Sequence, residues 1–201
     1  MDLNESVKTN FNDSFLLKEK IIDVLPAIVV KAGSLLAETI KNGGKILSCG
    51  NGGSASDAGH FVAEIVNRFQ IERDGLPAIS LASDVATLTA IANDHEYKYL
   101  FSKQIKALGN KADVLLVITT SGNSQNILEA INKAHKIGMP VIALTGKDGG
   151  EVVNILNPSD IEIRVPSKIT PRIQEIHILV IHCLCDLVDR ILFPNKFEKN
   201  S

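Results

Sequence analysis

Several residue types that mark particular kinds of protein are scarce or absent here. The chain has no tryptophan and only 4% aromatic residues, so it offers little surface for stacking the bases of single-stranded nucleic acid. Its three cysteines, Cys49, Cys183 and Cys185, form no C-x-x-C pair, which indicates a reducing compartment rather than a disulfide framework. Filling of the core explains Cys183 and Cys185 best.

Charge imbalance and long apolar runs are also absent. Lysine and arginine total 21 against 23 acidic residues, a net charge of -2, so nucleic acid and anionic membranes are not attracted in general. No run of about 18 apolar residues occurs, and MDLNESVKTN at the start has no basic patch followed by an apolar stretch. These absences predict a cytoplasmic protein that binds neither membrane nor nucleic acid directly.

What is present is the alternation of an α/β protein. Five short apolar runs, bounded by glycine or proline, alternate with stretches of helical spacing. Runs that are apolar on both faces belong to a parallel sheet covered on two sides. We therefore predict a three-layer α/β/α sandwich with strands at 45–49, 77–82, 113–119, 140–146 and 160–165, and helices at 25–40, 55–69, 85–108, 125–138 and 172–192.

The chain ends lie outside this pattern. Val7, Phe11 and Phe15 form a helical stripe that needs a surface to cover it, and a neighbouring subunit is one candidate. A chain of 201 residues with 45% hydrophobic content supports one sizeable core. The predicted division is an N-terminal helical segment for oligomer contacts at 1–24, one domain at 25–195 and a loose tail at 196–201.

Two loops of one design follow the first and third predicted strands. They read Gly50-Asn51-Gly52-Gly53-Ser54 and Thr120-Ser121-Gly122-Asn123-Ser124. Glycine lets the backbone approach a ligand, and free N–H groups at a helix start favour an anion. Each sequence is also an ordinary turn, but the repeated strand, turn and helix order favours a phosphorylated small molecule.

A dinucleotide site is the competing interpretation of the first loop. Gly50-x-Gly52-x-x-Ala55 fits a loose Rossmann fingerprint. That motif expects an acidic residue about 20 positions on, at the end of the next strand. Here Asp84 comes after that strand has ended, so a nucleotide cofactor ranks below a phosphosugar.

Ionisable side chains sit on two of the predicted helices. His60 and Glu64 are four positions apart on the helix that follows the first loop, and therefore share a face. Most such pairs lie on the surface, but the apolar neighbours Phe61 and Ile65 indicate a buried helix.

The last helix brings further polar side chains, Gln174, Glu175, His177 and His182. At about 100° per residue Gln174 and His182 point about 80° apart, and His177 is a rival on spacing alone. With His60 and Glu64 such a set is either a mixed N/O zinc site or a base and acid for proton transfer. Histidines satisfied within the core are an equal alternative.

Six motifs together resemble one known family. They are CGNGGS (49–54), HFVAE (60–64), AND (92–94), TTSGNS (119–124), ALTGKDGG (143–150) and RIQEIHILVIH (172–182). The chain resembles the bacterial phosphoheptose isomerases, also called sedoheptulose 7-phosphate isomerases, from about residue 20 to residue 193. They are built on the sugar isomerase (SIS) domain, which implies a flavodoxin-like sheet here.

The resemblance implies a reaction and an assembly. The family converts sedoheptulose 7-phosphate to D-glycero-D-manno-heptose 7-phosphate on the route to lipopolysaccharide heptose. Its members are cytoplasmic homotetramers that bind Zn²⁺.

The resemblance also implies roles for particular residues. Glu64 would be the catalytic base and His182 the acid. The metal ligands would be His60, Glu64, Gln174 and His182. The substrate would contact Asn51, Gly52, Gly53, Glu64, Asn93, Asp94, Thr119, Thr120, Ser121, Ser124 and Gln174.

Some features depart from the family or point elsewhere. Relatives commonly have an acidic residue at the position of Pro171. The ending LCDLVDRILFP also resembles a non-catalytic relative, the replication-initiator-associating protein, in which the counterparts of Glu64 and His182 are other residues. Because both are present here, an enzyme is favoured over a binding module or a sugar-phosphate sensor.

Overall fold

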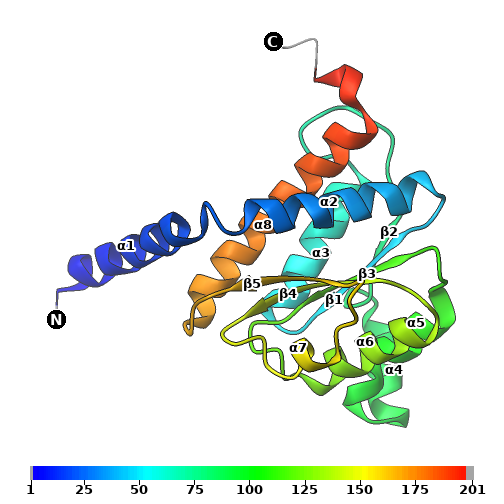
Figure 1. Ribbon diagram of the computed structural model, residues 1–201. Coiled ribbons are helices and arrows are strands. Elements are labelled where there is room, and N and C mark those ends of the chain that lie inside the picture. Colours follow the sequence, from blue (N-terminus) through cyan, green and yellow to red (C-terminus); the bar gives the residue numbers. More distant parts are fainter. Residues whose placement is uncertain (1, 198–201) are drawn as a thin grey trace.

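The computed structural model describes residues 2–197 (Figure 1). Its centre is a parallel sheet with strand order β2-β1-β3-β4-β5. The strands are β1 (Ile46–Gly50), β2 (Ala78–Ser80), β3 (Val114–Ile118), β4 (Val141–Gly146) and β5 (Ile161–Val165). The helices are α1 (Leu3–Ile21), α2 (Pro26–Lys41), α3 (Gly53–Val66), α4 (Val85–Asp94), α5 (Leu100–Leu108), α6 (Gln125–Lys136), α7 (Val152–Ile155) and α8 (Thr170–Leu192), with 3₁₀ turns η1 (Tyr97–Tyr99) and η2 (Pro194–Lys196).

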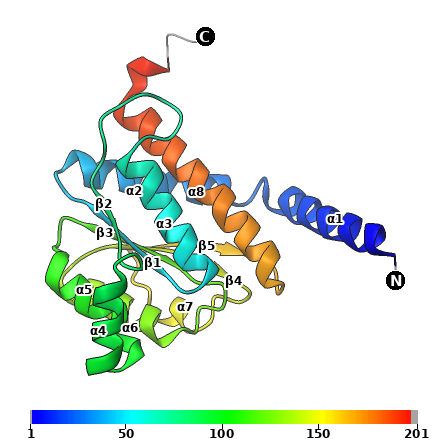
Figure 2. The ribbon, with the colours of Figure 1, turned by 180° about the vertical axis from the view of Figure 1, so that it is seen from behind.

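Helices cover both faces of the sheet, as the sequence predicts. In β3, Val114, Leu116 and Ile118 pack toward α2, α3 and α8, whereas Leu115 and Val117 pack toward α4, α5, α6 and α7. Figures 1 and 2 show these two helical layers on opposite sides of the strands. The three-layer α/β/α prediction is confirmed, and the strand order is the flavodoxin-like one.

The predicted helix at 85–108 is wrong in one respect, because the structure breaks it. His95 is extended, with φ -140° and ψ -175°, and separates α4 from η1 and α5. The Tyr97 hydroxyl, just beyond the break, donates a hydrogen bond to Asn51 Oδ1. A contact 46 residues away in sequence has overridden a continuous helical pattern.

Helix α1 projects away from the body of the molecule (Figures 1 and 2). The buried Arg172 of α8 donates to the main-chain oxygen of Asn10, while Phe11 and Phe15 are exposed. Most of the predicted tail, residues 198–201, lies outside the described residues. No helix within residues 2–197 is both long and apolar enough to cross a membrane.

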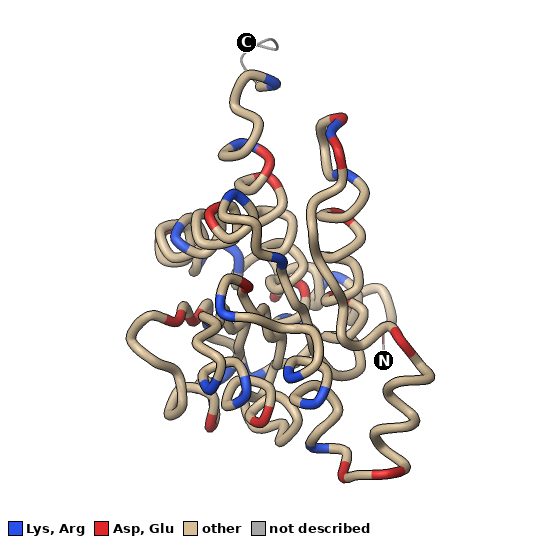
Figure 3. Tube along the Cα trace, turned by 90° about the vertical axis from the view of Figure 1, so that its right-hand side faces the viewer, with Lys and Arg blue, Asp and Glu red and all other residues tan. Residues whose placement is uncertain are grey.

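Charges of both signs are interspersed along the chain (Figure 3). The near balance of 21 basic and 23 acidic residues is thus spread over the fold. A ligand phosphate must therefore be recognised by local geometry.

Candidate functional site

The two glycine-containing loops lie side by side at the carboxyl edge of the sheet. Gly50 of β1 pairs with Ile118 of β3, and the loops that follow lead into α3 and α6. The strand order reverses between β1 and β3. Ligands of open α/β sheets bind at such a switch point, so both loops lie where a sheet of this order binds its ligand.

The loop after β3 is a cradle of hydroxyl and N–H groups. Thr119 Oγ1 accepts from Gly122 N at 3.2 Å, and Ser121 Oγ accepts from Asn123 N at 3.3 Å. Ser124 begins α6 without a side-chain capping bond. Gly122 has φ +68°, and a Cβ there would lie 1.9 Å from Gly149 O, so the turn requires glycine.

The loop after β1 is held by an amide pair that sequence reasoning missed. Asn51 Nδ2 donates to Asn126 Oδ1 at 2.9 Å, and Asn126 Nδ2 donates back to Asn51 Oδ1 at 2.8 Å. Asn126 lies in the first turn of α6 and is 2% exposed. Its place two residues after Ser124 was the only sequence signal. The pair joins the two loops directly.

Gln174 lies over the start of α3. A Cβ on Gly53 would come within 2.5 Å of Gln174 Nε2, so the glycine makes room for this side chain. Gly53 and the neighbouring Gly52 are exposed. The predicted substrate residues of the first loop and Gln174 are therefore brought together.

His60, Glu64 and His182 converge from two helices. His60 Nε2 is 3.2 Å from Glu64 Oε1 and 3.5 Å from His182 Nε2. The His182 ring also stacks on Phe69, with ring centroids 5.6 Å apart. A carboxylate and an imidazole from separate helices thus face one small space.

The structure does not place Gln174 in this cluster. Gly53, which it covers, precedes His60 by seven residues, or about 10 Å along α3. On α8, Gln174 precedes His182 by eight residues, or about 12 Å. Its assignment as a fourth metal ligand stays a prediction.

The donor atoms of the cluster suit a zinc ion. With Zn–N bonds of about 2.0–2.1 Å, donors on a tetrahedron are about 3.3 Å apart, close to the observed 3.2 and 3.5 Å. His60 Nε2 carries at most one hydrogen, so it can donate to Glu64 Oε1 or to His182 Nε2 but not to both. The neighbour that receives no hydrogen bond is left with a lone pair facing His60 Nε2, an arrangement that a metal ion would satisfy. Across residues 2–197 no three His, Cys, Asp or Glu side chains are already closed around one point. Binding would therefore draw Glu64 and His182 together around His60.

His177, the rival of His182, belongs to the core. Its side chain is fully buried and Nε2 donates to Thr145 O at 2.9 Å. Burial lowers the pKa of His177 to about 4, so the ring is neutral near neutral pH.

Asn93 and Asp94 end helix α4. Asn93 Nδ2 donates to Asp94 Oδ1 at 2.9 Å, and both residues are exposed. They lie three or four residues before Tyr97, whose hydroxyl reaches Asn51. Their predicted contact with substrate is not tested by these bonds.

Asp57 is a second residue that sequence reasoning missed. It lies one helical turn before His60, and its Oδ2 is buried without a partner within the described chain. Desolvation raises the pKa of Asp57, and His60 partly offsets that rise. The spacing of three residues from His60 was a signal for it.

Comparisons with known proteins agree with this arrangement. The SIS domain family matches residues 11–146. The phosphoheptose isomerase of Coxiella burnetii strain RSA 493 is 55% identical over 196 residues, 98% of each chain, and that of Shewanella oneidensis is 53% identical over 195 residues, 97% of this chain and 99% of the relative.

Solved structures give the same result. A phosphoheptose isomerase from Francisella tularensis is 46% identical with a TM-score of 0.92, covering 94% of this chain and 100% of that one. The one from Neisseria gonorrhoeae is 46% identical with a TM-score of 0.89, covering 94% of this chain and 99% of that one. The resemblance predicted from the six motifs is confirmed, and this chain belongs to the phosphoheptose isomerase family of SIS-domain proteins.

Proposed function

We propose that this protein converts sedoheptulose 7-phosphate to D-glycero-D-manno-heptose 7-phosphate, an aldose-ketose isomerisation. The observation that carries the proposal is the meeting of Glu64 and His182 at His60, with contacts of 3.2 and 3.5 Å. The phosphoheptose isomerases at 53–55% identity support the same reaction.

The two side chains supply a base and an acid. Glu64 takes a proton from C1 of the ketose, and His182 protonates the carbonyl oxygen at C2 to give an enediol. Glu64 then returns its proton to C2, while the O1 hydroxyl gives its proton to His182 as the C1 carbonyl forms, which restores both side chains to their starting states. The substrate gains and loses no atoms overall, so no further reactant is required.

The loop after β3 holds the phosphate. Thr120, Ser121 and Ser124 offer hydroxyl groups, and the first turn of α6 offers free N–H groups. Thr119 is buried and shapes the turn through Gly122 N. Recognition by dipoles is consistent with a loop that contains no lysine or arginine.

Zinc is part of the proposal. His60, Glu64 and His182 would hold it, leaving an open position as catalytic sites do. Zinc held there would supply a Lewis acid that can polarise a carbonyl. Because a ligated carboxylate is a weaker base, the roles of Glu64 as ligand and as base compete.

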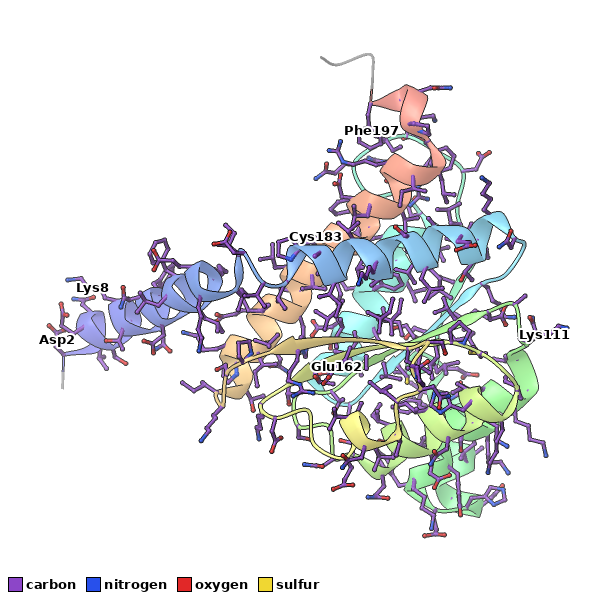
Figure 4. The ribbon with its side chains drawn as sticks, viewed as in Figure 1. Asp2, Lys8, Lys111, Glu162, Cys183 and Phe197 are labelled. Carbon is purple, nitrogen blue, oxygen red and sulfur yellow. The ribbon has the colours of Figure 1, made fainter. Side chains whose placement is uncertain are left out.

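The protein is further proposed to act as a cytoplasmic homo-oligomer, a tetramer by family resemblance, in lipopolysaccharide heptose synthesis. An apolar groove of about 800 Å³ supports association. It runs between α2 and α8, near Cys183 in Figure 4, and His182 and Phe69 line it.

A proton NMR time course on sedoheptulose 7-phosphate, with and without a chelator, tests substrate and metal together. The full chain is expected to form an aldose whose C2 proton exchanges with solvent, and chelation is expected to slow it. Glu64→Gln is expected to abolish turnover, whereas Glu38→Gln, on the exposed face of α2, keeps it. Full turnover by the Glu64 variant would remove this residue as the base.

A further inference from the structure

A buried ion pair joins the segment that follows α3 to α8, and α3 and α8 are the two helices that carry the proposed catalytic residues. Arg73 Nε donates to Asp189 Oδ1 at 2.5 Å, and the two side chains are 0% and 1% exposed. Arg73 lies in the segment after α3, and Asp189 lies on α8. Arginine and aspartate are almost never fully buried unless they are paired, so this contact is built into the fold.

Arg73 also holds the carboxyl end of α3 by its main chain. Nη2 donates to Glu64 O at 3.0 Å, and Nη1 donates to Ile65 O at 2.9 Å and to Asn67 O at 3.3 Å. The last carbonyls of a helix have no partner within the helix. The Arg73 guanidinium donates hydrogen bonds to several of these carbonyl oxygens, and one of them is the main-chain oxygen of Glu64.

Asp189 lies on the same face of α8 as His182. The two are seven residues apart, which is nearly two full turns. The buried Cys185 sits between them, and after desolvation the charges of Glu64 and Asp189 contribute to raising the pKa of its thiol. Glu64, Cys185 and Asp189 are therefore neighbours along this helix interface.

The His60 cluster thus lies between two ties that join α3 to α8. At one end Gln174 covers Gly53, and at the other Arg73 links the main chain of Glu64 to Asp189. Sliding of either helix would change the separation of Glu64 and His182. Catalysis depends steeply on such placement.

We infer that Arg73 and Asp189 are positioning residues, which set the distance between the proposed base Glu64 and the proposed acid His182. Their side chains bond each other and the main chain at the end of α3, and they act through the backbones of α3 and α8. The kinetic consequence of this inference rests on the proposed function, whereas its geometric consequence rests only on the hydrogen bonds of Arg73.

Asp189→Asn is the main test, because it keeps an oxygen for Arg73 Nε and removes the charge. We expect kcat per folded molecule to fall about 10- to 100-fold. KM should stay within about twofold, since the phosphate loop is untouched. Arg73→Lys, which retains the charge but not the fork of donors, should act in the same direction.

Asp113→Asn is the matched control. Asp113 is also 1% exposed and accepts from Lys45 Nζ at 2.6 Å, but it lies before β3 and its side chain bonds neither α3 nor α8. Both variants remove the charge of a buried aspartate that pairs with a basic side chain, so both lose stability. Only Asp189→Asn should lower kcat, and equal kcat in the two folded variants would overturn the inference. We expect a folded but slow enzyme. If Asp189→Asn and Arg73→Lys both fail to fold, that result also contradicts the inference.

A second measurement does not depend on turnover. Imidazole nitrogen NMR signals of His60 and His182 should shift in Asp189→Asn and stay in place in Asp113→Asn. Unchanged signals in both would overturn the inference even if the wild-type chain isomerised the sugar. An inactive wild-type chain with shifted signals would instead contradict the proposed function and leave the geometric claim standing.

Discussion

His177 is buried as a neutral base, and its burial lowers the stability of the fold only at acidic pH. Its ring is fully buried, Nε2 donates to Thr145 O, and Nδ1 has no partner within the described chain. Burial lowers the pKa of His177 from 6.5 to about 4. Between these values the unfolded chain binds a proton that the folded chain refuses, so stability falls as the pH drops from 6.5 toward 4.

Replacing His177 by Gln should remove this acid sensitivity. Gln retains a donor for Thr145 O and cannot become charged. Wild type should lose about 2–3 kcal/mol of unfolding free energy from this group between pH 7 and pH 4.5, and the variant should not. Urea unfolding at both pH values, at one protein concentration, measures the difference. His95→Gln, at an exposed position, serves as the control and should behave like wild type.

Asn126 offers a test of the link between the two loops. Asn126→Asp still accepts from Asn51 Nδ2 but loses the donor to Asn51 Oδ1. It also places a carboxylate in the first turn of α6, beside the proposed phosphate site. A repulsion of only about 1.4 kcal/mol raises KM tenfold, so KM should rise at least that much.

The control for Asn126 lies on the same helix. Asn132 is exposed, and Asn132→Asp adds the same charge away from the loops. Steady-state kinetics should show a raised KM only for the variant at position 126. A wild-type KM there would argue against phosphate binding at this end of α6.

At the scale of elements, the sequence predicts what repeats locally. The continuous apolar run of β3 and the helical spacing in α8 depend only on near neighbours, and both elements appear close to their predicted bounds. Both loops directly follow predicted strands, so their place at the carboxyl edge of a parallel sheet was also predictable.

Contacts between distant segments were not predictable in the same way. The Asn51–Asn126 pair spans 75 residues and the Arg73–Asp189 pair spans 116. Neither pair has a periodic signature, because each depends on where two elements meet after packing. The break at His95 has the same origin, since Tyr97 is drawn toward Asn51.

Two glycines with similar positive φ angles allow the role of the loop after β3 to be tested. Gly122 lies in that loop, and Gly138 lies between α6 and β4. Gly122 has φ +68° and a Cβ would lie 1.9 Å from Gly149 O, whereas Gly138 has φ +76° and a nearest contact of 3.8 Å. Gly138→Ala should cost about 1 kcal/mol of stability from its backbone alone and leave KM unchanged. Gly122→Ala should cost more and also raise KM, because the turn must open. Thermal unfolding and kinetics on both variants decide this, and a normal KM for Gly122→Ala would contradict the phosphate cradle.

At the scale of the whole molecule, the apolar stripe of α1 is not covered by other parts of the chain that the structure describes. Val7, Phe11 and Phe15 are exposed along a helix that projects from the body, and Phe11 is 76% exposed. Apolar residues that repeat along one exposed face of a helix are typical of an interaction surface, whereas single exposed apolar residues are not. The groove between α2 and α8 is an apolar surface of the same molecule, and self-association would bury both.

Phe11→Glu combined with Phe15→Glu should therefore break the assembly. Two charges on the stripe would have to be buried without partners, which association cannot repay. Sedimentation velocity should find wild type as a multiple of 21.7 kDa and the double variant as a smaller species. Thr9→Glu, about 160° around the helix from Phe11 and also exposed, should keep the wild-type mass. A double variant of unchanged mass would place the subunit contacts elsewhere, and a single-chain mass for wild type would remove the oligomer altogether.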